Sequence, residues 1–331
     1  MASTDQHIDP AAQQAIEPDT FDDKDSAYQG SLGDASYTTS ITSSAMNYTY
    51  NGRRYHSYHE GEYVLPNDEQ EQERLVLTHH IYSVLLGGEL HRAPVKNPGR
   101  VLDIGTGTGI WAIDFADEHP ESEVIGNDLS PIQPTWIPPN CRFEVDDFEL
   151  PWSYNTPFDY IHGRELEGFI RDHDHVFREA FRNLKPGGYF EIASFDVNTY
   201  SDDDTHLRAT NLLECVRCIR KASKDFGKDM FTTHTWKERI ERAGFVNVVE
   251  ETYKLPQSPW PKDRKLKELG RCHQVNMFEA IPPYCYALFT RVLGWERTEI
   301  EALVAGIRAE LKDLSLHLYT KVHIIYGQKP I

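Results

Sequence analysis

The stretch that decides the fold is V-L-D-I-G-T-G-T-G-I-W-A, at residues 101–112. The apolar run at 101–104 is typical of a short strand buried on both faces of a parallel sheet. Gly105, Gly107 and Gly109 then allow a tight turn that side chains would block. Apolar residues at helical spacing follow the turn. The stretch therefore predicts a strand, a glycine loop and a helix, with backbone N–H groups free to meet a ligand at the helix N-terminus.

The identity of that ligand depends on the glycine spacing. A dinucleotide fingerprint reads G-x-G-x-x-G, but here the third glycine comes one residue early and Ile110 takes its place. A phosphate-binding Walker loop would need G-K-[ST], which is missing. Asp103 lies in the strand just before the turn, where a carboxylate repels a pyrophosphate and attracts a cationic amino acid. The pattern resembles the nucleoside-binding loop of class I S-adenosylmethionine (SAM) methyltransferases; the alternative is a glycine turn in an ordinary βα unit.

Composition limits the classes of partner. The 331 residues carry 34 basic and 52 acidic side chains, a formal net charge of −18, which argues against a nucleic-acid-binding surface. No apolar run approaches the roughly 18 residues of a membrane span, so no membrane partner is expected. The polar N-terminus has neither a secretory signal nor a transit peptide. We expect a cytoplasmic protein, with a nuclear location as the alternative.

Cysteine usage indicates a reducing compartment. Five cysteines in a chain of this length do not make a disulfide framework. Cys215 and Cys218 form a lone C-x-x-C on a helical pattern, so buried thiols are favoured over metal or redox chemistry. We expect no metal site.

Three regions are expected along the chain: a disordered acidic tail over residues 1–46, an arm and helix over 47–90 that cap the cofactor site, and a methyltransferase domain over 91–331. Asn67 is the predicted N-cap of the helix in the second region, and Gly87-Gly88 its end. Of His79 and His80, one should face the core and the other solvent.

Tyrosines are concentrated in the arm at residues 48–65, interleaved with Arg and His. Such a segment is too polar for a core and too aromatic for a free tail. It either closes over a bound ligand or packs as a fixed flank on the domain. If it closes, Tyr55, Tyr58 and Tyr63 are the candidate lid and substrate contacts, and cation–π attraction to a sulfonium is one role for such tyrosines.

Predicted strands and helices alternate through the rest of the chain, which favours a doubly wound, Rossmann-like α/β sheet with helical insertions. Strands are expected at 123–128, 141–145, 158–162, 189–195, 246–253 and 317–326, and helices around 176–184, 207–222, 262–293 and 298–314. A sharp turn is expected at 185–188 and a break at Pro282-Pro283. Capping boxes are expected at Thr235-x-x-Glu238 and Thr298-x-x-Glu301.

Polar side chains fall at the ends of the predicted strands, where parallel sheets bind ligands. Asp128, followed by Leu129, comes 19 residues after Gly109, where a carboxylate can accept both ribose hydroxyls of an adenosine. Asp147 can accept from the adenine amino group, with Phe148 against the ring.

His162 ends the fourth predicted strand. At a strand end it faces the ligand crevice, so it is the candidate catalytic base or orienting group; the alternative is a histidine bonded to backbone.

Five motifs stand in methyltransferase order: V-L-D-I-G-T-G-T-G, V-I-G-N-D-L-S, E-V-D-D-F, F-D-Y-I-H-G-R and L-K-P-G-G-Y-F-E-I. The chain resembles, more narrowly, the LaeA-like family of fungal methyltransferases. That likeness is carried by N-G-R-R-Y-H-S-Y (51–58), L-P-N-D-E-Q-E-Q-E-R-L (65–75), T-H-H (78–80), G-T-G-T-G-I-W-A-I-D (105–114) and D-L-S-P-I-Q-P-x-W-x-P-P-N (128–140).

This resemblance implies a seven-stranded sheet with an antiparallel last strand, SAM as cofactor, and a link to fungal secondary metabolism. It places Asp103, Gly105, Gly107 and Gly109, with Thr106 in the same loop, around the methionine part of SAM. It also implies that Asp128 holds the ribose, Asp147 and Phe148 the adenine, and that His162 lies near the sulfonium.

Three functions fit these motifs. The first is a SAM-dependent methyltransferase with a small-molecule acceptor. The second is a regulator of secondary metabolism that binds SAM but acts through protein partners. The third is a SAM-fold enzyme that transfers no methyl group. The motifs predict SAM binding in all three cases and do not separate them.

Overall fold

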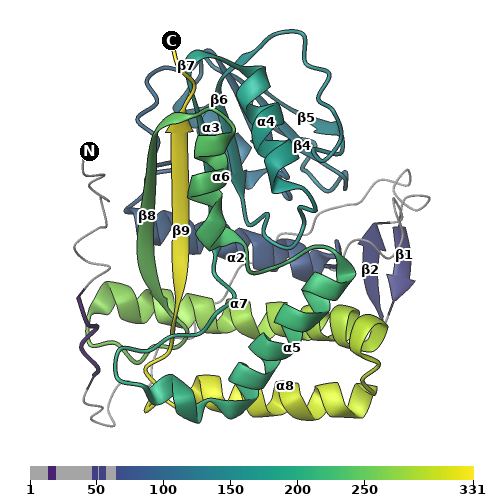
Figure 1. Cartoon of the computed structure of the whole chain (residues 1–331), viewed down its shortest axis with the longest axis vertical. Helices are drawn as coiled ribbons and strands as arrows, with labels where there is room; N and C mark the ends of the chain where they lie inside the picture. The colour runs from purple at the N-terminus through teal and green to yellow at the C-terminus, as the bar shows by residue number, and fades with distance from the viewer. Residues whose placement is uncertain (1–13, 20–46, 51, 57–64) are drawn as a thin grey trace.

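The computed structural model describes residues 14–19, 47–50, 52–56 and 65–331. A seven-stranded sheet in the order β5-β4-β3-β6-β7-β9-β8 forms the upper part of the molecule (Figure 1). Its strands are β3 (Arg100–Ile104), β4 (Glu123–Asp128), β5 (Cys141–Val145), β6 (Phe158–Arg164), β7 (Leu184–Phe195), β8 (Val246–Pro256) and β9 (Tyr319–Gln328). Only β9 runs antiparallel to its neighbours, β7 and β8, within this sheet. The predicted fold class, with its antiparallel last strand, is confirmed.

Helices cover both faces of the sheet because its central strands are apolar on both sides. On one face, Val101 and Tyr160 pack with α3 (Ile110–Glu118). On the other, Leu102 and Ile161 pack in a cluster with residues of α4 (His173–Asn183) and α6 (Trp236–Arg242). The two clusters fix the carboxyl ends of the strands, from which the glycine loop leaves.

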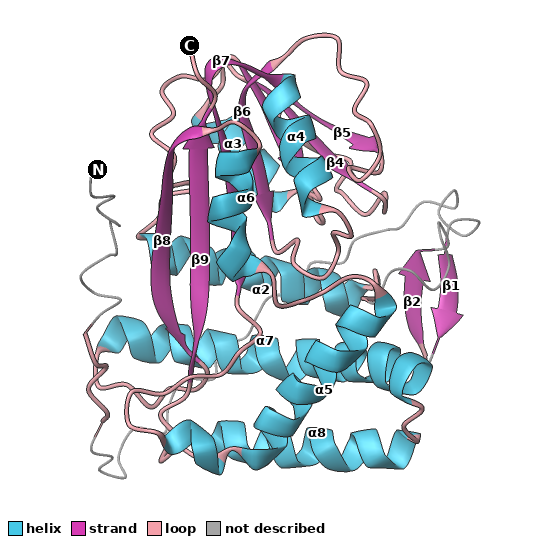
Figure 2. Ribbon diagram, in the orientation of Figure 1, coloured by secondary structure: helices cyan, strands magenta, loops and turns pink. Residues whose placement is uncertain are grey.

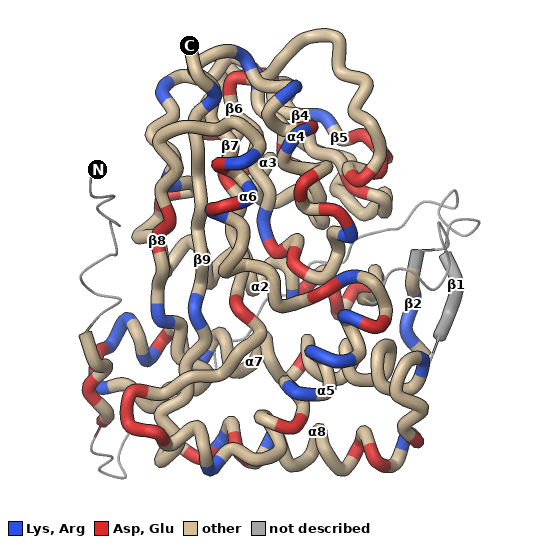
Figure 3. Tube along the Cα trace, in the orientation of Figure 1, with Lys and Arg blue, Asp and Glu red and all other residues tan. Residues whose placement is uncertain are grey.

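A layer of helices lies below the sheet (Figure 2). It contains α2 (Glu69–Leu86), α5 (Thr210–Phe226), α7 (Arg264–Leu288) and α8 (Arg297–Lys312). Short segments η2 (Thr205–Arg208), η3 (Thr233–Thr235) and the π-helical η4 (Phe289–Leu293) join these elements. The layer has its own apolar core, which includes Cys215, Cys218 and Cys285, so the expected buried thiols are confirmed. Both acidic and basic residues lie along the outer helix α8 (Figure 3).

The start of α2 differs by one residue from its prediction. Asp68, not Asn67, is the N-cap, and its side chain accepts from the backbone N–H of Glu71. Both residue types cap well, but Asp68 also holds the Arg53 guanidinium through two bonds, from Nε (2.5 Å) and Nη2 (2.7 Å). The helix ends at Gly87 as predicted. His79 is buried and His80 exposed, as expected of one core-facing and one solvated residue.

Both predicted capping boxes are wrong. The Thr235 hydroxyl donates to the Thr232 carbonyl and does not cap α6. Helix α8 begins at Arg297, and its capping box uses Glu296 and Glu299, two residues before the predicted pair. A glutamate at the N-cap satisfies the first N–H groups and also favours the positive helix end.

The predicted helix break and the predicted sharp turn both lie inside regular elements of the structure. Helix α7 continues through Pro282 and Pro283 and ends at Leu288. The turn expected at residues 185–188 lies inside β7, where the register with β6 shifts and Gly187 adopts φ +81°.

The arm forms a hairpin of β1 (Asn47–Tyr50) and β2 (Arg53–His56) beside the start of α2. Tyr55 is buried in this hairpin. Tyr58 and Tyr63 lie outside the described residues. Whether the arm closes over a ligand stays a prediction.

Residues 14–19 are the described part of the segment that the sequence predicts to be disordered, and they contact the region before α7. The N–H of Asp19 donates to the carbonyl of Trp260, and that of Lys262 donates to Glu17. The carboxylates of Glu17 and Asp19 also pair with Lys262 and Lys267. These acidic residues are held by the basic residues that flank the start of α7.

Candidate functional site

The glycine loop between β3 and α3 needs glycine at each of its three positions. Gly105, Gly107 and Gly109 have φ values of +62°, +58° and +79°. A Cβ atom on Gly105 would come within 2.5 Å of the Leu166 side chain, and one on Gly109 would overlap the ring of Phe143. Any side chain here would fill the space next to the loop. Gly105 and Gly107 line a large cavity; Gly109 caps α3 instead.

Asp128 ends β4 and faces this loop. Its Oδ2 accepts from the N–H of Gly107 and its Oδ1 from the N–H of Ser130, both at 2.9 Å. Burial raises the pKa of this carboxyl to about 6. Asp128 and Leu129 line the same cavity as the loop. The predicted ribose carboxylate therefore lies where a nucleoside held by the loop would meet it.

Asp103 and His162 form a buried pair behind the loop. The His162 Nδ1–H donates to Oδ1 of Asp103 over 2.7 Å, and the Thr106 hydroxyl donates to Oδ2 over 2.6 Å. The imidazole stacks on Trp111, with ring centroids 3.7 Å apart. Burial lowers the pKa of His162.

Neither Asp103, Thr106 nor His162 lines the cavity. His162 thus bonds a carboxylate. The alternative that the sequence offered to a catalytic role was a histidine bonded to backbone. The ring does not line this cavity, and the expected catalytic role of His162 stays a prediction.

Phe148 and Asp147 follow β5 and differ in whether they line the cavity. Phe148 lines the cavity, as expected of a residue that covers a base. The Asp147 carboxylate accepts from the N–H of Glu149 at 2.9 Å and does not line the cavity. Its predicted contact with adenine stays a prediction.

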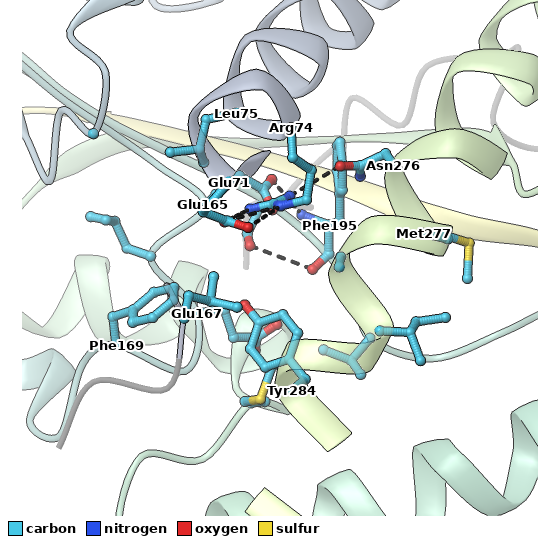
Figure 4. A pocket seen from close by; sticks show the side chains of 18 of the residues that line it. Glu71, Arg74, Leu75, Glu165, Glu167, Phe169, Phe195, Asn276, Met277 and Tyr284 are labelled. Atoms are coloured by element: carbon cyan, nitrogen blue, oxygen red, sulfur yellow. Dashed lines mark hydrogen bonds and ion pairs between the residues drawn. The ribbon is translucent and has the colours of Figure 1, made fainter. Parts of the chain in front are cut away.

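The cavity continues from the loop into the helical layer. Its far part lies between the loop after β6 and the facing sides of α2, α5 and α7. Figure 4 shows Arg74 and Glu71 on one side of this space and Phe169, Glu167 and Tyr284 on the other. This part has charged groups set among apolar walls.

Arg74 forms the main ion pair of this region. Its Nε and Nη2 donate to Glu71 one turn earlier on α2, at 2.6–3.1 Å. Its Nη1 donates to Oδ1 of Asn276 on α7 at 3.0 Å, and so links the two helices across the cavity. The guanidinium is held in place by two elements and is neutralised by Glu71.

Arg164 is the last residue of β6, and Glu165 follows it directly. Glu165 adopts φ +58°, and its Oε1 accepts from the Tyr82 hydroxyl at 2.5 Å and from the N–H of Phe195 at 3.0 Å. Arg164 lies over the Tyr82 ring, 4.7 Å from its centroid, and donates to Nδ1 of His79 at 3.0 Å. Burial raises the pKa of Glu165 and lowers that of Arg164.

Sequence reasoning missed this second part of the cavity. One signal was available: R-E-L-E at residues 164–167 sets two carboxylates around a leucine at the end of a buried strand. The other groups come from distant helices, and only the folded chain brings them together.

A family model described as a methyltransferase domain matches residues 78–250, which hold the glycine loop, Asp128 and the loop after β6. The chain belongs to this methyltransferase family. It is 40% identical over 303 residues to the methyltransferase pytC of Aspergillus terreus, covering 91% of this chain and 94% of that one.

Regulators resemble the chain as well. It is 34% identical to the secondary metabolism regulator LAE1 of Cochliobolus heterostrophus (86% of this chain, 95% of that one) and 36% identical to laeA of Monascus pilosus (85% and 77%). These relatives confirm the LaeA-like resemblance. Among solved structures, the cyclopropane synthase MmaA2 of Mycobacterium tuberculosis is similar at 16% identity and a TM-score of 0.45, over 75% of this chain and 84% of that one.

The cofactor of this methyltransferase is SAM, and the residues present fit it. Side chains on the loop glycines would fill the space that the ligand needs, and Asp128 stands at the strand end with a carboxylate. Phe148 adds an apolar wall. Gly105, Gly107 and Asp128 would hold the cofactor, and a methyl acceptor must bind beside it.

Proposed function

We propose that this chain transfers the methyl group of SAM to a small molecule of secondary metabolism. The observation that carries the proposal is the single cavity that joins the glycine loop and Asp128 to a second, mostly apolar part between α5 and α7. One end fits a nucleoside, and the other has room and polar groups for an acceptor. The relative pytC, named a methyltransferase, supports this proposal.

The chain's own residues would contribute enclosure and alignment. SAM, when bound, supplies a methyl group on a sulfonium sulfur. The sulfur is the leaving group and becomes a neutral thioether when the methyl group goes to the acceptor. Leu166 and Phe148, which approach Gly105, would keep water from the reacting groups. Residues of the helical layer would hold the acceptor in line, and such positioning supplies much of the rate in reactions of this kind. A base is needed only for a protonated acceptor.

A regulatory function is the second candidate, because LAE1 and laeA are at least 34% identical to this chain over most of its length. In that case the helical layer would serve protein partners, and SAM binding would not require a small acceptor. Among the described residues, no helix is long and apolar enough to cross a membrane. For nucleic acid, the net charge of −18 speaks against a partner of that kind.

Metabolite profiling of a strain that lacks the coding region tests the proposal. We expect one precursor to accumulate that is 14 mass units lighter than a missing product, the mass of a CH₂ group. Addition of that precursor and SAM to the purified chain should yield the missing product. A general loss of many products, with no single unmethylated precursor, would instead support the regulatory function.

A further inference from the structure

Three buried polar atoms that line the acceptor part of the cavity have no hydrogen-bond partner among the described residues. They are Oε2 of Glu167, Oε1 of Gln257 and Nδ1 of His273. They come from three segments: the loop after β6, the residue that directly follows β8 and the middle of α7. Buried polar atoms are normally paired, since an unpaired one costs about 1–3 kcal/mol. Three such atoms on one cavity point to a ligand that pairs them.

Glu167 offers a directed donor. Its Oε1 already accepts from the N–H groups of Thr232 (2.5 Å) and Thr233 (2.8 Å) and from the Thr232 hydroxyl (3.3 Å). Burial raises the pKa of this carboxyl to about 8, so it is mostly protonated at neutral pH. Since Oε1 is saturated with donors, the proton belongs on Oε2, the free atom.

Gln257 and His273 add complementary groups. The Gln257 amide N–H donates to the Thr199 hydroxyl at 3.1 Å, which leaves Oε1 as an acceptor for a ligand O–H or N–H. His273 packs edge-on against Phe195, 5.2 Å between ring centroids. Burial lowers its pKa to about 3, so the ring is neutral. The wall thus offers donors and acceptors without a free charge.

The charged side chains on this wall do not call for a charged ligand, because each has a partner within the chain. Glu71 and Arg74 bind each other, Arg164 donates to His79, Glu165 accepts from Tyr82, and Asp196 accepts from Tyr200. The remaining wall is apolar and includes Phe169, Val216, Ile219, Met277 and Ile281. Arg74 is paired with Glu71, and Arg164 has the carboxylate of its neighbour Glu165 beside it, so an anionic ligand would lose its hydration without gaining an unpaired cation.

We propose that Glu167, Gln257 and His273 form the acceptor subsite, and that the acceptor is an uncharged, largely apolar molecule bearing hydroxyl groups. This inference rests on the proposed function. Glu167 donates to an oxygen of the ligand, and Gln257 accepts from a hydroxyl. The three side chains bind and orient the acceptor.

The first test uses 2,7-dihydroxynaphthalene as an uncharged probe and naphthalene-2-carboxylate as a charged one. Both are titrated calorimetrically into the full chain saturated with S-adenosylhomocysteine (SAH), the demethylated product of SAM. We expect saturable binding of the diol and at least ten-fold weaker binding of the carboxylate. Equal affinity for the two probes, or no binding of the diol, would overturn the inference.

The second test removes the free polar atoms. Gln257→Leu and His273→Phe should each weaken diol binding by roughly three- to ten-fold, the usual range for one hydrogen bond. His273→Phe should also raise the melting temperature of the ligand-free chain, because it removes an unpaired polar atom. His80→Phe, at an exposed residue of α2 outside the cavity, is the matched control and should change neither property. Unchanged diol affinity in both cavity variants would contradict the subsite.

The third test asks whether Glu167 donates a hydrogen bond to the ligand or only supports the fold. Diol affinity of the unmodified chain should fall as pH rises from 6.5 to 8.5, since ionisation removes the Oε2 proton. Glu167→Gln keeps an acceptor for Thr232 and Thr233 and a donor for the ligand, so its affinity should not change over this range. A pH profile shared by both chains would refute the role of Glu167.

SAH titration without any probe distinguishes a failure of the subsite from a failure of the proposed function. If SAH binds and the diol experiments fail, the subsite falls while the methyltransferase proposal stands. If SAH does not bind to the folded chain, the proposed function falls, and the inference falls with it.

Discussion

Trp111 and His162 lie face to face, with ring centroids 3.7 Å apart and ring planes 7° from parallel. A side chain of α3 thus covers the imidazole. The one hydrogen bond described for the imidazole is donated to Asp103. His162→Phe should therefore cost about 1–3 kcal/mol in the free energy of unfolding, because Oδ1 of Asp103 loses its donor. His162→Asn keeps a donor and should cost less. Urea denaturation measures both.

The same two variants report on catalysis. If His162 acted as the base, both would abolish methyl transfer to any acceptor found and would leave folding intact. We expect instead that His162→Asn still transfers the methyl group, with the pH profile of the unmodified chain.

Asp128 should dominate cofactor affinity. Asp128→Ala removes a charge-assisted contact to the ribose and should weaken SAH binding by about 1.5–3 kcal/mol, roughly ten- to 150-fold. Asp146→Ala is the matched control, since among the described residues that side chain bonds only the N–H of Asp147, and it does not line the cavity. Calorimetric titration compares the two. Equal losses would mean that the ribose does not lie against Asp128.

SAH affinity should depend on pH through the same carboxyl. The pKa of Asp128 in the free chain is raised to about 6, and the ribose hydroxyls bind the ionised form. Affinity should therefore be constant above about pH 7 and fall by up to ten-fold per pH unit below 6. Asp128→Asn should bind more weakly but lack this dependence. A profile that survives in Asp128→Asn would assign the proton to another group.

Glu167 should make the ligand-free chain less stable as pH rises. Its pKa is raised from 4.5 to about 8 in the folded chain, so the folded state holds the proton where the unfolded state has lost it. This contribution to stability is complete below pH 4.5, declines between 4.5 and 8, and is gone above 8. The Glu167→Gln variant has no titrating group at this position. Its free energy of unfolding, relative to that of the unmodified chain, should therefore increase from pH 4.5 to pH 8. Parallel curves from urea denaturation would contradict the shifted pKa.

The arm should become more ordered when SAH binds, if it is a lid. The hairpin is tied to α2 by Arg53 and Asp68, and Leu65 and Asn67 line the cavity next to it. We expect amide hydrogens of residues 47–56 to exchange more slowly in the complex. Residues 14–19, which lie at the start of α7, provide the internal control. Equal protection of the arm with and without SAH would make it a fixed flank.

The sequence located the sheet well because its signals are local. Buried parallel strands read as short apolar runs, and Glu123–Asp128 and Cys141–Val145 begin and end as predicted. The caps were less predictable. Asn67 and Asp68 are both good caps, and the choice between them depends on Arg53, which approaches from another part of the chain.

The cofactor end of the cavity could be predicted from spacing, as Gly105, Gly107 and Asp128 show. The acceptor end could not. Arg74, Glu167 and His273 are each unremarkable in the sequence, and they meet only because α2 and α7 lie side by side beneath the strand ends. No local pattern encodes that meeting.

The position of β9 has a consequence for how the protein is made. This strand comes after β8 in the sequence, yet it lies between β7 and β8 and forms the link between them. While a ribosome is still synthesising residues 319–328, β8 has no partner in the sheet. Until β9 is in place, the two long strands β7 and β8 therefore each keep an open edge, which favours aggregation.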